Sequence, residues 1–125
     1  MDWACYIPFE GDFNEIESFL GLSLPDDLKD VIKNYNKGCP LKSQFSYGDE
    51  TDEIERFISF NRDGESNIYD YFVDDLQERK LLPFATTEND NILCLKNSKV
   101  IVYNAERDEE TALCASVSEL LQMLY

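Results

Sequence analysis

The sequence predicts an α+β fold, in which N-terminal helices are followed by a mainly antiparallel β-sheet and a C-terminal helix. Two segments before residue 40 repeat apolar residues at helical spacing, and another such segment ends the chain. Between them lie short apolar or alternating segments, several joined by linkers of only a few residues, as in antiparallel hairpins. A chain of 125 residues fits one hydrophobic core, so residues 1–125 are expected to form one domain.

Capping residues mark the two N-terminal helices. The first helix is predicted to begin after Asp12, which can accept a hydrogen bond from the amide of Glu15, and to end at Gly21. The second is predicted to place Pro25 at its first helical position and to end before Gly38. The apolar faces of the two helices comprise Phe13, Ile16, Phe19, Leu20, Leu28, Val31, Ile32 and Tyr35.

After the second helix the apolar period changes from helical to alternating. Gln44–Tyr47 and Ile54–Phe60 are predicted as strands, separated by an acidic turn over residues 48–53. Ser66 or Asn67 can then cap a third helix. The apolar face of that helix would be formed by Ile68, Phe72, Val73 and Leu76.

Three strands follow in quick succession, over residues 82–87, 92–96 and 100–105. Their linkers, 88–91 and 97–99, are turn sequences, so the strands are expected to pair as an antiparallel meander. The rest of the chain offers one further strand, Thr111–Ala115, and two alternative caps for the last helix, Ser116 and Ser118. One core is expected to contain Leu28, Ile32, Phe57, Phe84, Leu93, Val102 and Leu121.

The charge balance restricts the class of partner. The chain has 26 acidic and 11 basic residues, which give a net charge of −15. Repulsion from phosphate groups argues against binding to nucleic acid or to an anionic membrane surface. A cationic protein partner is favoured instead.

Histidine is absent, which excludes a Ser-His-Asp triad, a His-ligated zinc ion and imidazole acid–base chemistry. The four cysteines, Cys5, Cys39, Cys94 and Cys114, form no C-x-x-C pair, so neither a metal nor a cofactor is expected. The first residues lack the basic and apolar regions of a secretory signal, so none is expected, and no apolar run approaches the roughly 20 residues that span a bilayer. We expect a cytoplasmic protein with reduced thiols, with two disulfides as the alternative, and a buried, unreactive Cys94.

The acidic residues are not arranged for catalysis. Adjacent pairs such as Asp26/Asp27 and Asp74/Asp75 diverge by about 100° on a helix, so their carboxylates do not converge on one substrate atom. No nucleophile stands beside a base. The sequence therefore does not predict an enzyme.

Two acidic clusters remain, over residues 49–55 and 106–110. Each concentrates like charge in a predicted loop, and the common interpretation of such a run is a solvated loop. The functional interpretation is a surface that meets a basic groove on a partner, where complementary charge raises the association rate. The candidate partner-binding residues are Asp49, Glu50, Asp52, Glu53, Glu55, Asp108, Glu109 and Glu110.

Several short motifs follow one another in a defined order along the chain. They are Leu20–Pro25 (LGLSLP), Tyr35–Gly38 (YNKG), Phe57–Phe60 (FISF), Leu82–Ala85 (LPFA), Asn91–Leu95 (NILCL), Val100–Tyr103 (VIVY) and Ser116–Leu121 (SVSELL). In this order they resemble the SUKH superfamily, the Smi/Knr-type group, over about residues 12–124. Two turns depart from the family pattern: residues 88–90 replace a glycine-rich turn, and Lys37 stands at a glycine position.

This resemblance implies a non-catalytic binding protein of α+β fold. Many bacterial members of the superfamily are immunity proteins, which bind and neutralise a toxin, often a nuclease. A few are regulators that bind a cellular client, as in the yeast member. The resemblance therefore implies a toxin as partner, with a regulatory scaffold as the alternative, and it transfers no binding residue because the toxin-facing surface varies among members.

Overall fold

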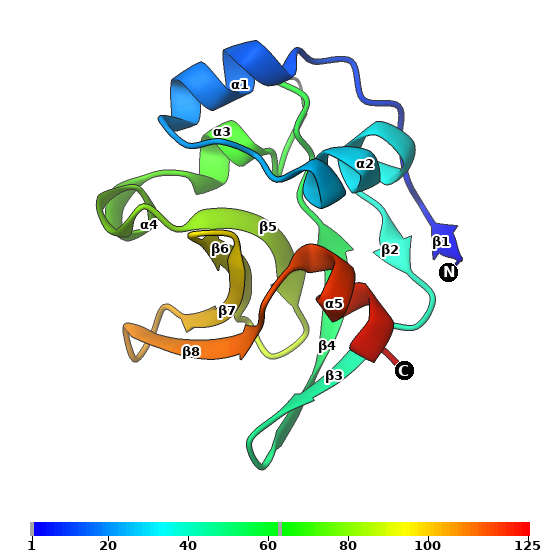
Figure 1. Cartoon of the computed structure of the whole chain (residues 1–125), viewed down its shortest axis with the longest axis vertical. Coiled ribbons are helices and arrows are strands. Elements are labelled where there is room, and N and C mark those ends of the chain that lie inside the picture. Colours follow the sequence, from blue (N-terminus) through cyan, green and yellow to red (C-terminus); the bar gives the residue numbers. More distant parts are fainter. Residues whose placement is uncertain (1, 63) are drawn as a thin grey trace.

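A six-stranded antiparallel sheet forms the centre of the computed structural model, which describes residues 2–62 and 64–125 (Figure 1). Its strands lie in chain order, β3-β4-β5-β6-β7-β8, so each pairs with the next and the predicted meander is confirmed. The strands are β3 (Gln44–Tyr47), β4 (Glu50–Phe57), β5 (Leu82–Thr87), β6 (Ile92–Lys96), β7 (Lys99–Asn104) and β8 (Glu109–Cys114). The strand expected near Thr111 is therefore present as the edge strand β8.

The helices lie before, within and after this sheet, as an α+β fold requires. They are α1 (Phe13–Leu20), α2 (Asp26–Tyr35), α3 (Ile68–Tyr71), α4 (Asp74–Arg79) and α5 (Val117–Met123). A small second sheet pairs β1 (Trp3–Ala4) with β2 (Cys39–Pro40). There Trp3 stacks on Tyr35 of α2 at 5.0 Å between ring centroids, so this aromatic residue packs within the fold.

The caps follow the sequence signals with small shifts. The Asp12 side chain caps α1, but it accepts from the amide of Asn14 at 2.8 Å rather than from Glu15. Pro25 is the N-cap of α2 and not its first helical residue, because its ψ of 152° is still extended. Of the alternative caps, Asn67 caps α3 and Ser116 caps α5.

The single third helix predicted from the apolar pattern is wrong, because Val73 is extended and separates α3 from α4. Ile68 and Phe72 pack into the main core, whereas Leu76 joins a second cluster with Cys94 and Tyr103. Alternation along β6 and β7 places these two clusters on opposite faces of the sheet. The break thus lets one chain segment cover both faces. Burial also raises the pKa of the Cys94 thiol, in keeping with the predicted unreactive cysteine.

The acidic turn predicted over residues 48–53 is also wrong, because β4 already begins at Glu50. Only Gly48 and Asp49 connect β3 to β4, and Gly48 adopts the left-handed φ of 58°. Buried and exposed residues alternate along β4, so most of its acidic side chains lie on the exposed face of a strand.

The strand predicted to reach Phe60 instead ends at Phe57. The following residues stay buried: the amide of Ile58 still donates to the Phe84 carbonyl of β5, and the side chain of Asn36 then accepts from the amide of Phe60 at 2.9 Å. Lys37 and Asp90, which lie in the two turns that depart from the glycine pattern, adopt positive φ angles of 61° and 62°. Each of these turns therefore has a left-handed backbone conformation at a residue other than glycine.

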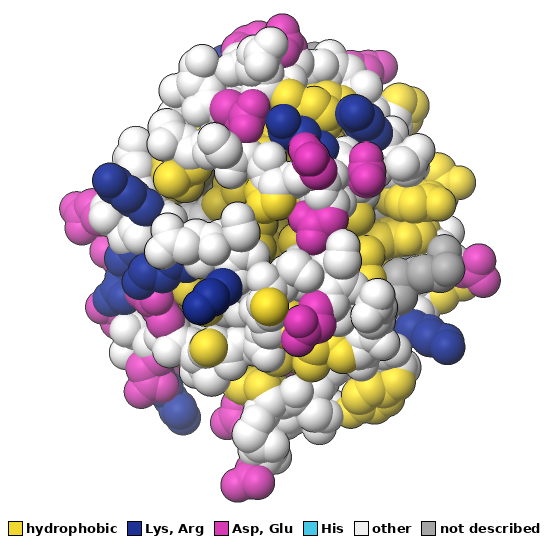
Figure 2. All heavy atoms as spheres, in the orientation of Figure 1, with side chains coloured by type: hydrophobic (Ala, Val, Ile, Leu, Met, Phe, Trp, Pro, Cys, Tyr) yellow, Lys and Arg dark blue, Asp and Glu magenta, His cyan; other side chains and the backbone are white. Residues whose placement is uncertain are grey.

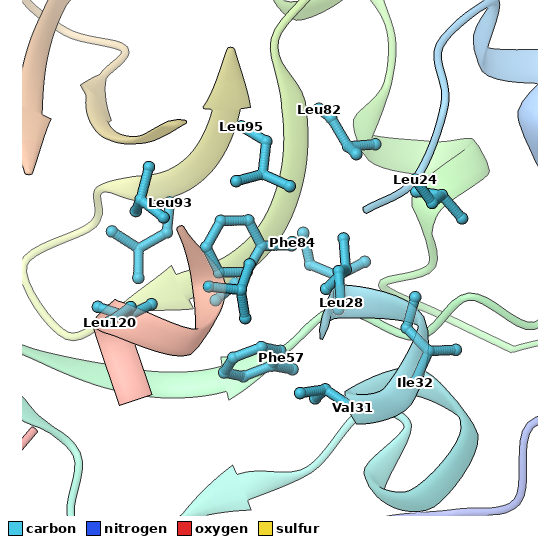
Figure 3. Packing of buried hydrophobic residues seen from close by; sticks show 14 of the residues in the cluster. Leu24, Leu28, Val31, Ile32, Phe57, Leu82, Phe84, Leu93, Leu95 and Leu120 are labelled. Atoms are coloured by element: carbon cyan, nitrogen blue, oxygen red, sulfur yellow. The ribbon is translucent and has the colours of Figure 1, made fainter. Parts of the chain in front are cut away.

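The main core lies between the sheet and helices α2 and α5 (Figure 3). Leu28 and Val31 of α2 and Leu120 of α5 point toward Phe57, Phe84 and Leu93 of the sheet. The predicted core residues are confirmed except Leu121, which is half-buried at its margin, while its neighbour Leu120 is fully buried. Because Ser116 is the cap, Val117 and Leu120 form the inward face of α5, and Leu124, which follows the helix, is buried as well.

Truncation to alanine should distinguish Leu120, which lies in the core, from its neighbour Leu121, which lies at the core's margin. We expect Leu28→Ala and Leu120→Ala each to lower the free energy of unfolding by about 2–5 kcal/mol, because each leaves a cavity at a fully buried position. Leu121→Ala should cost clearly less. Urea denaturation measures all three, and an equal loss for Leu120 and Leu121 would contradict the orientation of α5.

Candidate functional site

The structure brings the two acidic segments of the sequence together at one end of the sheet. In an antiparallel meander, alternate turns lie at the same end, so the β3–β4, β5–β6 and β7–β8 turns are neighbours. Between them lies a hollow of about 650 Å³, which we call the acidic hollow. Its lining includes Tyr47, Asp49, Glu50, Asn91, Arg107 and Glu109.

Three of the candidate residues, Asp49, Glu50 and Glu109, line this hollow and are exposed. Within residues 2–62 and 64–125, none of these three carboxylates takes part in an ion pair. Their charge is therefore available to a partner.

Asp52 has a different role, because its side chain is only 3% exposed. Its carboxylate accepts hydrogen bonds from the amides of Glu53 at 2.7 Å and Asn89 at 3.1 Å, and from Nδ2 of Asn91 at 3.1 Å. A buried carboxylate with three donors is a structural element, which ties β4 to the β5–β6 turn.

Glu53 and Glu55 are exposed on β4 but are not among the residues that line the hollow. The Glu53 carboxylate accepts from the hydroxyl of Ser43 at 2.8 Å, and that of Glu55 accepts from Thr86 at 3.1 Å. The structure thus does not bring these two residues together with the hollow-lining acids.

Asp108 and Glu110 are engaged within the fold. Arg79 of α4 forms ion pairs with both carboxylates, and Lys96 pairs with Glu110 at 3.0 Å. The hydroxyl of Tyr103 donates to Asp108 at 2.8 Å, and together with Arg79 it lowers the pKa of that carboxyl. Lys96 and Arg79 likewise lower the pKa of Glu110. These contacts fasten the β7–β8 hairpin to α4.

The lining of the hollow also contains polar residues that the sequence did not predict, above all Asn91. It is only 5% exposed, and its Nδ2 donates to Asp52 and contacts the Tyr47 hydroxyl at 3.4 Å. Its Oδ1 is buried and, among the described residues, has no hydrogen-bond partner. In the sequence, an asparagine after Asp90 is typical of a turn, so no local signal marks Asn91 as a buried residue of the site.

Other kinds of site find little support. In the described part of the chain, no group of three or more cysteine or acidic side chains could hold a metal ion. No helix of that part has the length and apolar character needed to cross a membrane. All four cysteines are present as free thiols.

One comparison with known proteins identifies a family. The model of the SMI1/KNR4 family (SUKH-1) matches residues 9–123, which is nearly the whole chain. Neither the search of curated proteins nor the search of solved structures found a match.

Removing the buried carboxylate should destabilise the fold. We expect Asp52→Ala to lower the free energy of unfolding by about 1–3 kcal/mol, because the change removes the acceptor shared by the amide of Asn89 and the buried Nδ2 of Asn91. The control Asp49→Ala, at an exposed position of the same hairpin, should change it by less than about 0.5 kcal/mol. Urea denaturation of both variants measures this, and equal effects would contradict the structural role of Asp52.

Stability should fall at alkaline pH through two tyrosines. Partial burial and the neighbouring Glu50 raise the pKa of Tyr47 to about 12, and burial with the hydrogen bond to Asp108 raises the pKa of Tyr103 to about 12. The ordinary value is 10.0, so the folded state favours the neutral hydroxyls. Their contribution should be full below pH 10 and be lost as the pH rises through about 12.

Urea denaturation across that range measures the loss, and ultraviolet absorbance of tyrosinate follows the titration. The double variant Tyr47→Phe with Tyr103→Phe should lose less stability over the same pH interval. A wild-type free energy of unfolding that stays constant from pH 10 to 12 would contradict the shift.

Proposed function

The chain belongs to the SMI1/KNR4 family (SUKH-1), and we propose that it is a bacterial immunity protein that binds a cognate toxin and neutralises it. Family membership supports a SUKH-type protein of the immunity or Smi/Knr kind. Our proposal is the more specific one: a cytoplasmic protein that forms a stoichiometric complex with a basic toxin of the nuclease type. It acts by occluding the toxin surface, with no chemistry of its own.

The observation that carries this proposal is the set of unpaired carboxylates around the acidic hollow. Asp49, Glu50 and Glu109 come from two hairpins far apart in sequence and are left without ion pairs among the described residues. Their mutual repulsion gains nothing for the fold. A nuclease carries a basic groove for the phosphate backbone, and an acidic surface that covers this groove would block substrate.

The distribution of charge on the molecule supports this end as the contact surface. Figure 2 shows acidic side chains at the lower tip, where the β3–β4 hairpin ends, as well as over the rest of the visible face, while Lys and Arg side chains lie on the left, near the top and on the right but not at this tip. A net charge of −15 gives a long-range attraction for a basic partner, and the free carboxylates at the tip would orient it.

The direct test uses the protein encoded by the reading frame next to this one in its genome. We expect that protein to be toxic when expressed alone, and co-expression of the present chain to restore growth through an equimolar complex in size-exclusion chromatography. Restored growth without a complex would contradict occlusion. A non-toxic neighbour that forms no complex would favour the Smi/Knr-type regulator that binds a cellular client.

Charge reversal of the three carboxylates that line the acidic hollow should slow association with the toxin. We expect Asp49→Lys, Glu50→Lys and Glu109→Lys together to lower the association rate by about tenfold or more, and to weaken its dependence on salt. Stopped-flow fluorescence at several ionic strengths measures both quantities. Urea stability should hold or rise, because the substitutions relieve repulsion between exposed groups.

The matched control reverses Asp26, Asp30 and Asp70, which are exposed on helices α2 and α3 and are not among the residues lining the hollow. The net charge changes by the same amount, so any general effect of charge is equal in the two variants. If the control slows association as much as the rim variant, attraction is non-specific and the hollow is not the contact surface.

A further inference from the structure

We propose that Cys5 and Cys39 are a site of reversible oxidation, at which a peroxide converts the two thiols into one intramolecular disulfide bond. Cys5 directly follows β1 and Cys39 belongs to β2, and these two short strands lie side by side (Figure 1). Neither cysteine lines the acidic hollow. The site is therefore separate from the proposed contact surface and independent of the proposed function.

The register of the backbone brings the two cysteines close together. Ala4 is the antiparallel partner of Cys39, and a hydrogen bond of 2.9 Å from the amide of Ile7 to the carbonyl of Asn36 continues the same register. Cys5 is thus displaced from Cys39 by one residue along paired backbones, which puts their Cα atoms roughly 6 Å apart. Disulfide bonds join Cα atoms about 4.4–6.8 Å apart, so the bond can form without a large movement of the backbone.

The two thiols are in contact. Cys5 has a left-handed φ of 58°, so its side chain departs from the alternation of β1. Burial is the main cause that raises the pKa of Cys39, and the charge of Cys5 together with a hydrogen bond between the two thiols raises it further. A hydrogen bond between thiols places the two sulfur atoms side by side, and small side-chain rotations then bring them to bonding distance.

The exposure of each thiol indicates its step in the reaction. Cys5 is exposed whereas Cys39 is half-buried, so a peroxide in solution meets Cys5 first. The Cys5 thiolate attacks one oxygen of hydrogen peroxide and becomes a sulfenic acid, and the released hydroxide takes up a proton to form water. The Cys39 thiolate then attacks Sγ of Cys5 and displaces a second hydroxide, which also becomes water. The two thiols lose two electrons and two protons, and one peroxide molecule is reduced to two water molecules.

Arg56 of β4 favours the second step. Burial raises the pKa of Cys39, but the positive charge of Arg56 counteracts this effect and stabilises the thiolate that attacks. The fold holds this cation beside the pair, because the amide of Phe57 donates to the carbonyl of Gly38 at 2.8 Å. These two residues are the chain neighbours of Arg56 and Cys39.

The other two cysteines are not placed to pair with each other. Cys94 belongs to the second cluster, whereas Cys114 packs against the main core on the opposite face of the sheet. Burial raises the pKa of both thiols, and the Cys114 thiol donates to the carbonyl of Ser116 at 3.5 Å. The structure thus favours one disulfide, between Cys5 and Cys39.

The bond would fasten the N-terminal segment to the fold. Trp3 already holds this segment, since it stacks on Tyr35 and meets the ring of Phe57 edge-on at 5.1 Å between centroids. The disulfide would close a loop over residues 5–39, which contains both α1 and α2. Because such a loop restricts the unfolded chain, the oxidised protein should resist urea better than the reduced protein.

The experiment treats the fully reduced whole chain with hydrogen peroxide under native conditions, alkylates the remaining thiols in denaturant, and maps the peptides by mass spectrometry. We expect one disulfide that links Cys5 to Cys39, alkylated thiols at Cys94 and Cys114, and recovery of all four thiols after dithiothreitol. Three products would overturn the inference: an alkylated Cys39, a sulfinic acid at Cys5, or a disulfide from either residue to Cys114 or to a second chain.

Variants then connect the bond to stability. Cys5→Ser and Cys39→Ser should each abolish the disulfide, and the matched control Cys114→Ser, at another half-buried cysteine, should leave it unchanged. Oxidation should raise the urea midpoint of the wild type and of the control by about 1 M or more, and should leave that of Cys5→Ser unchanged. An oxidised wild type that unfolds at the same or a lower urea concentration would mean that the fold strains the bond, and the inference would fail.

A glutathione redox buffer measures how strongly the fold favours the pair. Because the disulfide and the fold stabilise each other by the same factor, the effective concentration of the two thiols should be about tenfold or more higher in the folded protein than in urea. An effective concentration that is equal or lower in the folded protein would show that the native backbone holds the thiols apart, and would refute the site.

Discussion

The buried carboxylate of Asp52 is the contact on which the shape of the acidic hollow depends. It lies on β4, yet its oxygens accept hydrogen bonds from the amide of Asn89 and the side chain of Asn91, both at the β5–β6 turn. Burying a carboxylate is costly unless several donors meet it, and here three do. The carboxylate thus joins two hairpins and fixes the orientation of Asn91, which is among the residues that line the hollow.

The order of the strands supplies the second constraint. Because the six strands lie in chain order, every second turn returns to the same end of the sheet, and the acidic segments of β3–β4 and β7–β8 meet there. Like charges brought together in this way repel each other. The structure limits the repulsion by pairing Asp108 and Glu110 with Arg79 and Lys96, away from the rim.

Much of the fold could be predicted from sequence, because its signals are local. The strands Leu82–Thr87 and Ile92–Lys96 lie where their apolar pattern and flanking turns place them, and the cap at Ser116 precedes the last helix. What failed depends on contacts distant in sequence. The division between α3 and α4 reflects the two faces of the sheet, and the role of Asp52 reflects partners 37 and 39 residues away. The acidic residues of one run look alike in the sequence, and only the folded structure shows which groups each of them contacts.

That assignment separates the acidic residues into two kinds with different consequences for binding. Asp52, Asp108 and Glu110 already have their donors, so a partner would gain little by approaching them and would have to compete with existing hydrogen bonds. Asp49 and Glu109 have no such contacts among the described residues and Glu50 has only the Tyr47 hydroxyl, so a cation placed among the three gains attraction and relieves repulsion at once. The affinity of this surface for a basic partner therefore depends on which carboxylates the fold leaves unpaired, more than on the net charge of the whole chain.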